Sequence, residues 1–394
     1  MKDFWAEGLE NQRKEKIKKF LILLSVILVL VGIVVIILCY IYYVPFRNWC
    51  DNKILKKEIL QESTKSIELD GDENTQIYAY DKYICLFRKK NLEYYNKVGT
   101  KIATVNLDIN KVSFTSAGRY MAIGEESGTK FYLICGKEIL FNSQVDGTIK
   151  QINVSKDGYV SVVISNANYK SIVIVYNKNG KEIFKTNLVT SRVADVSISQ
   201  DSKYLAIAEI DISGILIKSS IQIVSIELAQ TNPKESIIYK YEAPTDKLIL
   251  NIEYQTKNQL VCMYNNSIDI LQDQNDTEII NFENKKLSFM TIGLNNRVAY
   301  LEEISTGEYT SNTNVNIINP NTRKSIEYVV GDVAKAICTS DNKIAINFGT
   351  ELHIINKSGF LIKKYISETE INEIVMTDSL IGVIYRDKIQ IINL

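Results

Sequence analysis

The sequence predicts an all-β fold, an eight-bladed β-propeller that follows one transmembrane α-helix. A polar turn followed by an apolar strand with one small residue at its centre recurs along almost the whole chain, most clearly at residues 199–209. The copies are spaced by about 40 residues, the period of propellers and other repeat arrays. Before the copies begin, residues 20–43 carry no charged side chain. These patterns predict a membrane anchor and then a ring of sheets.

The small residue occupies one position in every copy, and we call this set the small-residue column. Its members are Cys85, Ala122, Ser161, Ala206, Cys262, Ala299, Ala345 and Gly382. In a propeller the second strand of each sheet lies near the axis, where neighbouring sheets converge and a large side chain would clash. Eight members therefore predict eight blades. A seven-bladed ring is the alternative, because the copy that starts near Ile77 matches the pattern least well.

The two ends of the repeated region are expected to share one blade. The last copy stops at Leu394 after three strands, so its sheet lacks an outer strand. Residues 65–69 resemble residues 324–328, the outer strand of the sixth copy, yet they precede the first complete copy. Pairing them with the last strand would close an open sheet edge. We therefore expect Ile67 to lie beside Ile389 and Ile391.

The chain divides into four expected segments. These are a short basic tail (1–19), the transmembrane anchor (20–43), a stalk (44–63) with a short amphipathic helix over residues 51–63, and the propeller domain (64–394). The anchor is long enough to cross a hydrocarbon core of ~30 Å. A cleaved signal peptide would have a shorter apolar region and a small-x-small cleavage site, so an uncleaved anchor is expected.

Basic residues set the expected orientation in the cell membrane. Five of them precede the apolar stretch closely, namely Arg13, Lys14, Lys16, Lys18 and Lys19, whereas those beyond it are more dispersed. Because basic flanks tend to remain in the cytoplasm, we expect a cytoplasmic N-terminus and an extracytoplasmic propeller. Cys50 lies just beyond the anchor and is a candidate for a disulfide between two chains.

Composition and motifs give little support to catalysis or to nucleic-acid binding. The chain has 46 basic and 46 acidic residues, so no net field attracts a nucleic acid. His353 is the single histidine, which excludes metal sites with several histidines and leaves one candidate for any catalytic triad. Phosphate-binding, nucleophile-elbow and zinc-protease motifs are absent from the sequence. We expect a protein without a cofactor that is not an enzyme.

One stretch has part of the spacing of a calcium-binding loop. Asp70, Asp72, Asn74 and Asp81 occupy its first, third, fifth and twelfth positions. Thr75 stands where that loop needs glycine for a sharp turn, and the twelfth position lacks the longer glutamate that binds through both oxygens. An acidic turn before the first blade is the simpler interpretation, and these residues are a weak metal candidate.

Six carboxylates follow the small-residue column in alternate copies. They begin three residues after the column, where the strand leaves the sheet, and comprise Glu125, Glu126, Glu209, Asp211, Glu302 and Glu303. The two longest excursions after this strand, residues 210–220 and 304–314, follow the same strands. Because extra loop length on one face of a repeat array often marks the binding face, we expect these carboxylates to bind a basic partner or a cationic group. Solvated acidic residues at strand ends are the alternative.

The turn-plus-strand units SQDSKYLAIAE, TSAGRYMAIGE and SKDGYVSVVIS resemble those of the WD40-like and quinoprotein-like propeller superfamily. The overall order, a basic tail, one anchor and then a propeller, resembles an uncharacterised family of single-pass envelope proteins of Gram-positive bacteria. The Gly-His and Trp-Asp dipeptides of WD40 repeats are absent, so their hydrogen-bonded tetrad is not carried over. The resemblance implies the fold and the envelope location, and it supplies no catalytic residues.

These observations lead to one expected function and two alternatives. A propeller without chemistry motifs chiefly offers loop faces for docking, so we expect a non-enzymatic protein-interaction scaffold at the cell envelope. The first alternative is a sensor that binds a small molecule or a glycan at the propeller axis. The second is a hydrolase that uses the acidic ring, which would need paired carboxylates in different environments.

Overall fold

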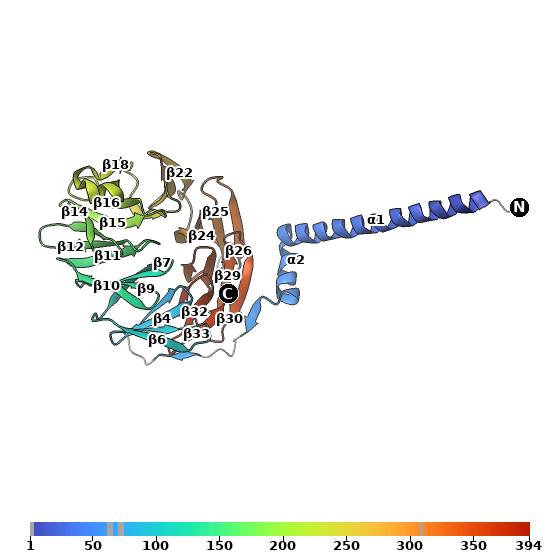
Figure 1. The fold of residues 1–394 in the computed structure, drawn as a ribbon, viewed down its shortest axis with the longest axis horizontal. Helices are drawn as coiled ribbons and strands as arrows, with labels where there is room; N and C mark the ends of the chain where they lie inside the picture. The colour runs from blue at the N-terminus through green and yellow to red at the C-terminus, as the bar shows by residue number, and fades with distance from the viewer. Residues whose placement is uncertain (1–3, 61–65, 70–74, 308–309) are drawn as a thin grey trace. The chain divides into compact units, whose positions relative to one another are not determined.

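The computed structural model describes residues 4–60, 66–69, 75–307 and 310–394. The chain forms two compact units, Met1–Ile59 and Leu60–Leu394, which are described separately. The first unit is helical and the second is a ring of β-sheets (Figure 1).

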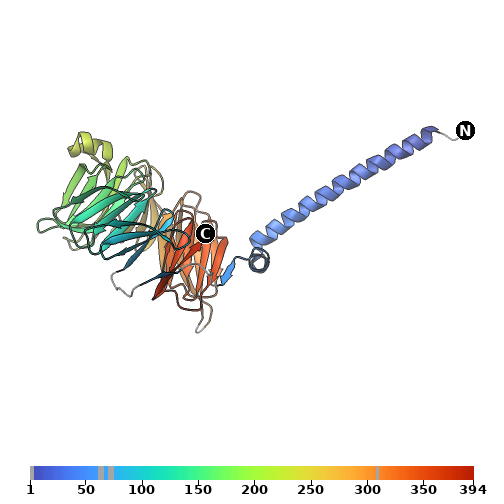
Figure 2. The ribbon, with the colours of Figure 1, turned by 60° about the horizontal axis from the view of Figure 1, so that its bottom comes forward.

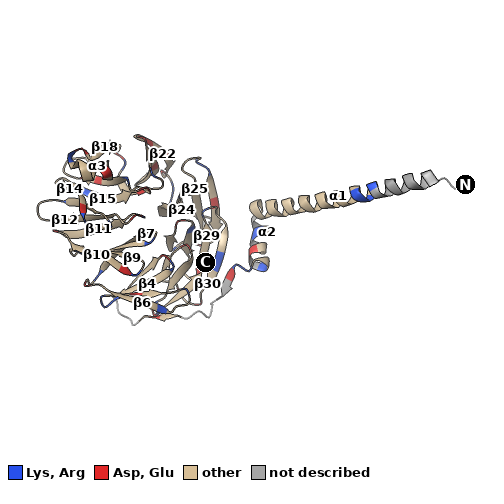
Figure 3. Cartoon of the chain, viewed as in Figure 1, with Lys and Arg blue, Asp and Glu red and all other residues tan. Residues whose placement is uncertain are grey.

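One long helix, α1 (Phe4–Tyr42), dominates the N-terminal unit. Its part Lys16–Tyr42 has a mean hydropathy of 3.6. Figure 3 shows basic residues at the start of this part and an uncharged helix after them. By length and composition, this helix fits a membrane span or a signal sequence. Helix α1 continues without a break across residues 19 and 20, the expected boundary between tail and anchor.

The segment after α1 differs from its prediction. Tyr43 has an extended backbone (φ −109°, ψ 96°), and α2 (Val44–Trp49) and a π-helical turn, η1 (Cys50–Ile54), follow it. The amphipathic helix expected over residues 51–63 is wrong beyond this turn. Lys56 has a positive φ of 46°, which a continuing helix does not allow, and β1 (Glu58–Leu60) follows. Residues 61–63 of the expected helix lie outside the described residues.

A polar cluster holds this turn. The Tyr40 hydroxyl donates a hydrogen bond of 2.7 Å to Asp51, which is buried, and Lys57 forms an ion pair of 2.7 Å with the same carboxylate. Cys50 is also buried here. A disulfide from Cys50 to a second chain would therefore require the turn to open.

The first four blades of the ring are consecutive four-stranded antiparallel meanders. Blade 1 has β3 (Gln76–Tyr80), β4 (Tyr83–Arg88), β5 (Asn91–Tyr95) and β6 (Lys101–Asn106). Blade 2 has β7 (Val112–Ala117), β8 (Tyr120–Glu125), β9 (Lys130–Cys135) and β10 (Glu138–Gln144). Blade 3 has β11 (Thr148–Val154), β12 (Val160–Ser165), β13 (Ser171–Tyr176) and β14 (Glu182–Leu188). Blade 4 has β15 (Ser191–Ile198), β16 (Tyr204–Asp211), β17 (Lys218–Ser225) and β18 (Ile237–Glu242), with α3 (Ile226–Thr231) and the 3-10 turn η2 (Pro233–Glu235) before its last strand.

The last four blades complete the ring. Blade 5 has β19 (Ile249–Tyr254), β20 (Gln259–Tyr264), β21 (Ser267–Gln272) and β22 (Asn275–Asn281). Blade 6 has β23 (Leu287–Leu294), β24 (Arg297–Ser305), β25 (Ser311–Ile318) and β26 (Ser325–Val330). Blade 7 has β27 (Ala336–Thr339), β28 (Lys343–Asn347), β29 (Glu351–Asn356) and β30 (Leu361–Ile366). Blade 8 has β31 (Glu373–Met376), β32 (Leu380–Ile384) and β33 (Lys388–Asn393).

The fourth strand of blade 8 comes from the other end of the propeller unit. It is β2 (Ile67–Glu68), which pairs Ile67 with Ile389 and Glu68 with Lys388 in antiparallel register. Ile67 packs with Ile389 and Ile391 in one buried apolar cluster. The prediction of eight blades closed by both chain ends is therefore confirmed, and the seven-bladed alternative is wrong. In Figure 1 the first and last blades accordingly lie next to each other, and Figure 2 shows the same ring tilted towards its edge.

The small-residue column lies on the second strand of every blade, and all eight members are buried. Ala122 and Ala206 pack in apolar clusters with residues of the following blade. At Gly382 an added Cβ would come within 3.1 Å of Ile84 in blade 1. The steric argument for small residues therefore holds at these positions, because the gap between blades is narrow there.

Blade 5 departs from this pattern. Cys262 packs in a cluster with Ala206 and Ala208 of the preceding blade, whereas its neighbour Val261 packs against blade 6. The assignment of Cys262 to the small-residue column is therefore wrong in this blade. A shift of one position along a strand moves a side chain to the other face of the sheet, so Val261 holds the position that the small residue holds elsewhere.

Candidate functional site

The connections between strands define two faces of the propeller. Because each blade is an antiparallel meander, the turns between its first and second strands emerge on one face, which we call the turn face. The loops between the second and third strands emerge on the other, together with the connections between blades. The Glu126 amide, for instance, donates to the Lys111 carbonyl oxygen at 2.8 Å, which joins such a loop to the preceding connection. We call this second face the crown face, because it carries the six predicted carboxylates.

An axial cavity of about 730 Å³ opens among the first strands of the blades and their turns. All eight blades line it, each with residues at or near the turn after its first strand, and examples in blade order are Asp81, Gly118, Lys156, Gln200, Gln255, Asn295, Asp341 and Asp378. The cavity therefore belongs to the turn face. This is the side opposite to the one that carries the six predicted carboxylates, although the weak metal candidate Asp81 lines the cavity.

One position on the first strand of each blade lies opposite the column position on the second strand. We call these the inner-ring residues; in blade order they are Tyr78, Thr115, Asn153, Ser197, Glu253, Thr291, Cys338 and Val375. Several of them bond to the next blade. The Asn153 side chain donates to the Val196 carbonyl oxygen at 2.6 Å, and the Ser197 hydroxyl accepts from the Tyr254 amide at 3.0 Å.

Glu253 is an inner-ring residue with a charged side chain, and it differs from Asn153 and Ser197 in its contacts. No hydrogen bond or ion pair holds its carboxylate within the described part of the chain, and it lines the cavity. Gly293 of blade 6 lies across the gap between blades 5 and 6, and a Cβ added there would be 3.7 Å from Glu253 Oε2. Burial, together with the carboxylates of Asp195 and Asp341, raises the pKa of Glu253 to about 7 against the opposing effect of Lys156. The cavity is thus lined by a carboxyl group whose pKa lies near neutral pH.

Asp195 is the second buried carboxylate of the cavity, and it joins three blades. Its side chain accepts hydrogen bonds from Gln151 Nε2 in blade 3, from the Val196 amide at 2.8 Å and from the Ile252 amide of blade 5 at 2.9 Å. Burial raises the pKa of Asp195, although these hydrogen bonds oppose the shift. Asp195 is therefore a structural anchor for the strand that positions Glu253.

The sequence analysis did not single out Glu253 or Asp195. Both lie on the first strand of a blade, within the apolar runs NIEY and VADV. A carboxylate in such a run, on a strand that faces the axis, is the signal that could have identified them. The small-residue column marked the second strand of each blade instead. In blade 5 the column was assigned to Cys262, which pairs with Ile252, so the pairing of Val261 with Glu253 was missed.

On the crown face, lysines from the connections between blades pair with three of the six predicted carboxylates. Lys111 lies 2.9 Å from Glu126, and Lys286 lies 2.8 Å from Glu303. Lys285 lies 3.1 Å from Glu302. The pKa of Glu303 is lowered by its hydrogen bond to Lys286. The crown face thus presents paired charges at these points.

The other three predicted carboxylates differ from one another. Glu209 is buried and accepts a hydrogen bond of 2.6 Å from the Ser191 hydroxyl, while burial raises its pKa. Asp211 is partly exposed and accepts from the Ser213 amide at 2.8 Å. The Glu125 side chain lies over Gly128, where any added Cβ would clash with it. The six residues therefore share a face without forming one cluster, and their role in binding stays a prediction.

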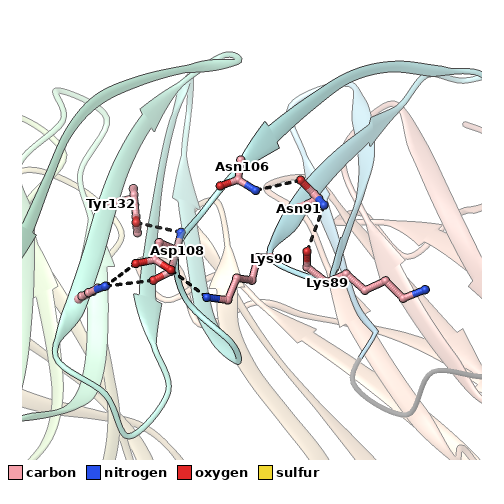
Figure 4. Close-up of polar contacts among 7 residues, drawn as sticks. Lys89, Lys90, Asn91, Asn106, Asp108 and Tyr132 are labelled. Atoms are coloured by element: carbon pink, nitrogen blue, oxygen red, sulfur yellow. Dashed lines mark hydrogen bonds and ion pairs between the residues drawn. The ribbon is translucent and has the colours of Figure 1, made fainter.

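A further acid on this face is held in the same way (Figure 4). Asp108 lies between blades 1 and 2, and its two oxygens pair with Lys90 at 2.8 Å and with Lys130 at 2.7 Å. Its backbone amide donates to the Tyr132 hydroxyl at 3.1 Å. Hydrogen bonds from the two lysines lower the pKa of Asp108 to about 2. Asp108 thus joins blades 1 and 2 on the crown face through its two ion pairs.

The weak calcium candidate is only partly within the described residues. Asp70, Asp72 and Asn74 lie outside them, whereas Asp81 occupies the turn between β3 and β4 and lines the axial cavity. In the described ranges, no three His, Cys, Asp or Glu side chains are arranged to hold a metal ion. His353 lies away from the cavity, between blades 6 and 7, where its ring lies 2.9 Å from the Tyr328 hydroxyl.

The fold and this site together define a β-propeller with a polar axial cavity and one apolar N-terminal helix. The chain belongs to the family of unknown function DUF5711, whose model matches residues 56–394. No curated protein matches the sequence.

Solved structures resemble the chain at low sequence identity, and two of them reach a TM-score of 0.51. BamB from Moraxella catarrhalis is similar with a TM-score of 0.51 and 13% identity, covering 84% of this chain and 99% of that one. A eukaryotic initiation factor is similar with a TM-score of 0.51 and 10% identity, covering 84% of this chain and 86% of that one. The C-terminal WD40 domain of Sif2 has a TM-score of 0.42 and 12% identity, over 71% of this chain and 94% of that one. At these identities the likeness concerns the fold alone.

Proposed function

We propose that this protein is a membrane-anchored, extracytoplasmic β-propeller that acts as a non-enzymatic scaffold and docks a protein partner on its crown face. The apolar helix supports the anchor, and the basic residues before it support the orientation. The resemblance to single-pass envelope proteins of Gram-positive bacteria supports a place at the cell envelope. Propellers commonly serve as binding scaffolds, which supports the general role.

The observation that carries this proposal is an exposed apolar loop on the crown face. Residues 212–217 connect β16 to β17, and four of them are large apolar residues in solvent: Ile212, Ile215, Leu216 and Ile217. Ile215 is fully exposed and Leu216 is 61% exposed. A cluster of this kind costs solubility when it stays uncovered, and such patches mark sites of interaction.

The surroundings of this loop suit a protein partner. Val189, which is also exposed, lies in the connection from blade 3 to blade 4, on the same face. Asp211, at one end of the loop, accepts hydrogen bonds from the Thr190 and Ser213 hydroxyls, which supplies polar groups beside the apolar residues. Apolar anchors with a polar rim are the usual composition of protein interfaces.

Site-specific crosslinking tests this proposal in intact cells. Two full-length variants, Ile215→Cys and Asn179→Cys, are treated with a membrane-impermeant maleimide that carries a photoreactive group. Asn179 is exposed in the turn between β13 and β14, on the turn face, and serves as the matched control. We expect both cysteines to be labelled in intact cells and only position 215 to yield a discrete crosslinked protein.

Two results would count against the proposal in different ways. Labelling of both sites only after cell lysis would place the propeller in the cytoplasm. The same crosslinked species from both positions, or none from 215, would remove the crown face as a docking surface.

A second candidate function is favoured by the axial cavity. A polar cavity lined by all eight blades is suited to a small molecule, as in a sensor that binds its ligand at the propeller axis. This site lies on the turn face, so a ligand there and a protein partner on the crown face can coexist.

A further inference from the structure

We propose that the axial cavity binds a small organic cation, and that Glu253 is the counter-ion for its ammonium group. This inference deepens the second candidate function, the axial small-molecule site, and does not depend on partner docking at the crown face. It stands on the composition of the cavity, on the unpaired position of Glu253 and on the space in front of it.

The cavity carries an excess of acidic side chains in a chain without net charge. Among the described residues, five acids line it, namely Asp81, Asp195, Glu253, Asp341 and Asp378, against the single base Lys156. The whole chain has equal numbers of acidic and basic residues. In a concave site of low dielectric constant, such an excess attracts cations more strongly than the same charges do on an open surface.

Glu253 is the acid placed to make direct contact with a ligand. Asp195 is already satisfied by three hydrogen bonds from neighbouring strands. Glu253 has no such partner among the described residues, although the inner-ring residues Asn153 and Ser197 do bond to the next blade. A half-buried carboxylate without partners is costly when ionised in a site of low dielectric constant, and an ammonium group that donates to it would offset that cost.

A second unsatisfied acceptor lies close by. Gln255 is 3% exposed and lines the same cavity. Its amide nitrogen donates to three backbone carbonyl oxygens of β23 and β24 in blade 6, at 2.6 to 3.2 Å. Its Oε1 is buried and accepts no hydrogen bond from the described residues. The cavity lining thus contains a second polar group that lacks a donor.

Gly293 supplies the space in front of Glu253. A Cβ at this position would be in ordinary contact with Thr339 Oγ1, at 3.4 Å, and with Glu253 Oε2, at 3.7 Å. Its absence leaves the carboxylate accessible from the cavity. The remaining lining is rich in hydroxyl and amide groups, including Thr115, Ser155 and Ser197, which suits a hydroxylated amine better than an apolar one.

The charged groups around Glu253 predict how binding depends on pH. Burial raises its pKa most, the carboxylates of Asp195 and Asp341 raise it as well, Lys156 lowers it, and the outcome is about 7. The carboxyl is therefore increasingly protonated below pH 7, and a cation should bind the ionised form. Affinity is expected to rise as the pH increases from 5 to 8.

Calorimetric titration of the detergent-solubilised full chain tests the proposal. The probes are four amines, glucosamine, ethanolamine, lysine amide and spermidine, together with glucose and ethylene glycol as neutral analogues. We expect at least one amine to bind at pH 8, with affinity that falls at pH 5 and is reduced about tenfold or more in Glu253→Gln. The neutral analogues and Mg²⁺ or Ca²⁺ alone should give no comparable signal.

Two further variants separate a local effect from a general one. Gly293→Ala keeps all charges but fills the space in front of the carboxylate, so it should also weaken amine binding. Glu182→Gln removes an exposed carboxylate on the outer strand of blade 3, away from the cavity, and should leave binding unchanged. Thermal unfolding checks each variant, and Glu253→Gln should be at least as stable as the parent at pH 8, because it removes a buried charge.

The proposal is overturned if none of the four amines binds more tightly to the parent protein than to Glu253→Gln. It is also overturned if a neutral analogue binds equally well, or if the divalent ions alone reproduce the signal. Failure of the crosslinking at position 215 would leave these results unaffected, so the two proposals can fail separately.

Discussion

At the scale of single residues, the ring depends on how little room each blade leaves for its neighbour. Gly382 shows this most directly, since an added Cβ would lie 3.1 Å from both Ile84 Cδ1 and Val375 Cγ2. Ile84 is completely buried in blade 1, and Val375 lies directly opposite Gly382 on the neighbouring strand of the same blade, so both side chains have little freedom to move. The small-residue column is therefore a packing requirement, and its members carry no chemistry that we can assign.

Replacing this glycine should destabilise the propeller for a steric reason. Gly382→Val introduces a residue that is favoured in strands, so a loss of stability would reflect overpacking, with an expected cost of about 1–3 kcal/mol. Thermal and denaturant unfolding of the full chain measure it. Gly214→Ala is the matched control, because its Cβ would meet only one backbone oxygen at 3.7 Å. Equal effects of the two changes would contradict the steric explanation.

The residue scale is also where prediction from the sequence was weakest. Residue size alone selected Cys262, but the face to which a side chain points depends on the register of its strand. Val261 and Cys262 are both buried apolar residues, so composition could not distinguish them. Because of this error the sequence did not identify Glu253 as a cavity residue: its pairing with Val261 is what places this carboxylate on the inner ring.

At the scale of elements, the blades are held to one another by polar contacts as well as by apolar clusters. The clearest buried example lies in blade 5, where Lys247 before β19 forms ion pairs with Asp269 on β21 and with Glu278 on β22, the latter at 3.1 Å. Asp269 is completely buried and also accepts a hydrogen bond of 2.6 Å from Ser267. The lysine therefore links the connection between blades 4 and 5 to the outer part of blade 5.

Removing this lysine should cost far more than removing an exposed one. Lys247→Met leaves Asp269 as an unpaired buried charge, so we expect a loss of about 3–5 kcal/mol in the free energy of unfolding. Lys111→Met, which breaks the exposed pair with Glu126, should cost less than about 1 kcal/mol. Adding Asp269→Asn to Lys247→Met should recover part of the loss. Unfolding of the two lysine variants at the same denaturant concentration would contradict the expected cost of leaving Asp269 without its lysine.

Element boundaries were predictable where the repeat was regular and not elsewhere. The closing strand at residues 65–69 was found because it resembles another outer strand, and β2 occupies its centre. A helix over residues 51–63 was expected because the apolar residues there have helical spacing. The prediction is wrong because Lys56 takes a positive φ, which the spacing of apolar residues does not reveal. The long excursion at residues 210–220 was found, but part of it extends β16 and β17, so that the exposed apolar loop is confined to residues 212–217.

At the scale of the whole molecule, the ring separates two kinds of site. The crown face carries the loops and the connections between blades, with an exposed apolar loop and paired charges. The turn face carries the axial cavity, with an unpaired carboxylate. The sequence directed attention to the crown face because its loops are long and acidic, whereas the cavity is formed by single residues from eight blades that only closure of the ring brings together.

All of these inferences depend on the closure of the ring by its two ends, and one measurement tests it directly. The double variant Ile67→Cys with Ile389→Cys places two cysteines directly opposite each other on neighbouring strands, within the reach of a disulfide after small adjustments. After mild oxidation and proteolysis, mass spectrometry should find the peptide with residue 67 joined to the peptide with residue 389, whereas Ile67→Cys with Glu182→Cys should give no such link. Absence of the link between 67 and 389 in folded protein would contradict the eight-bladed ring.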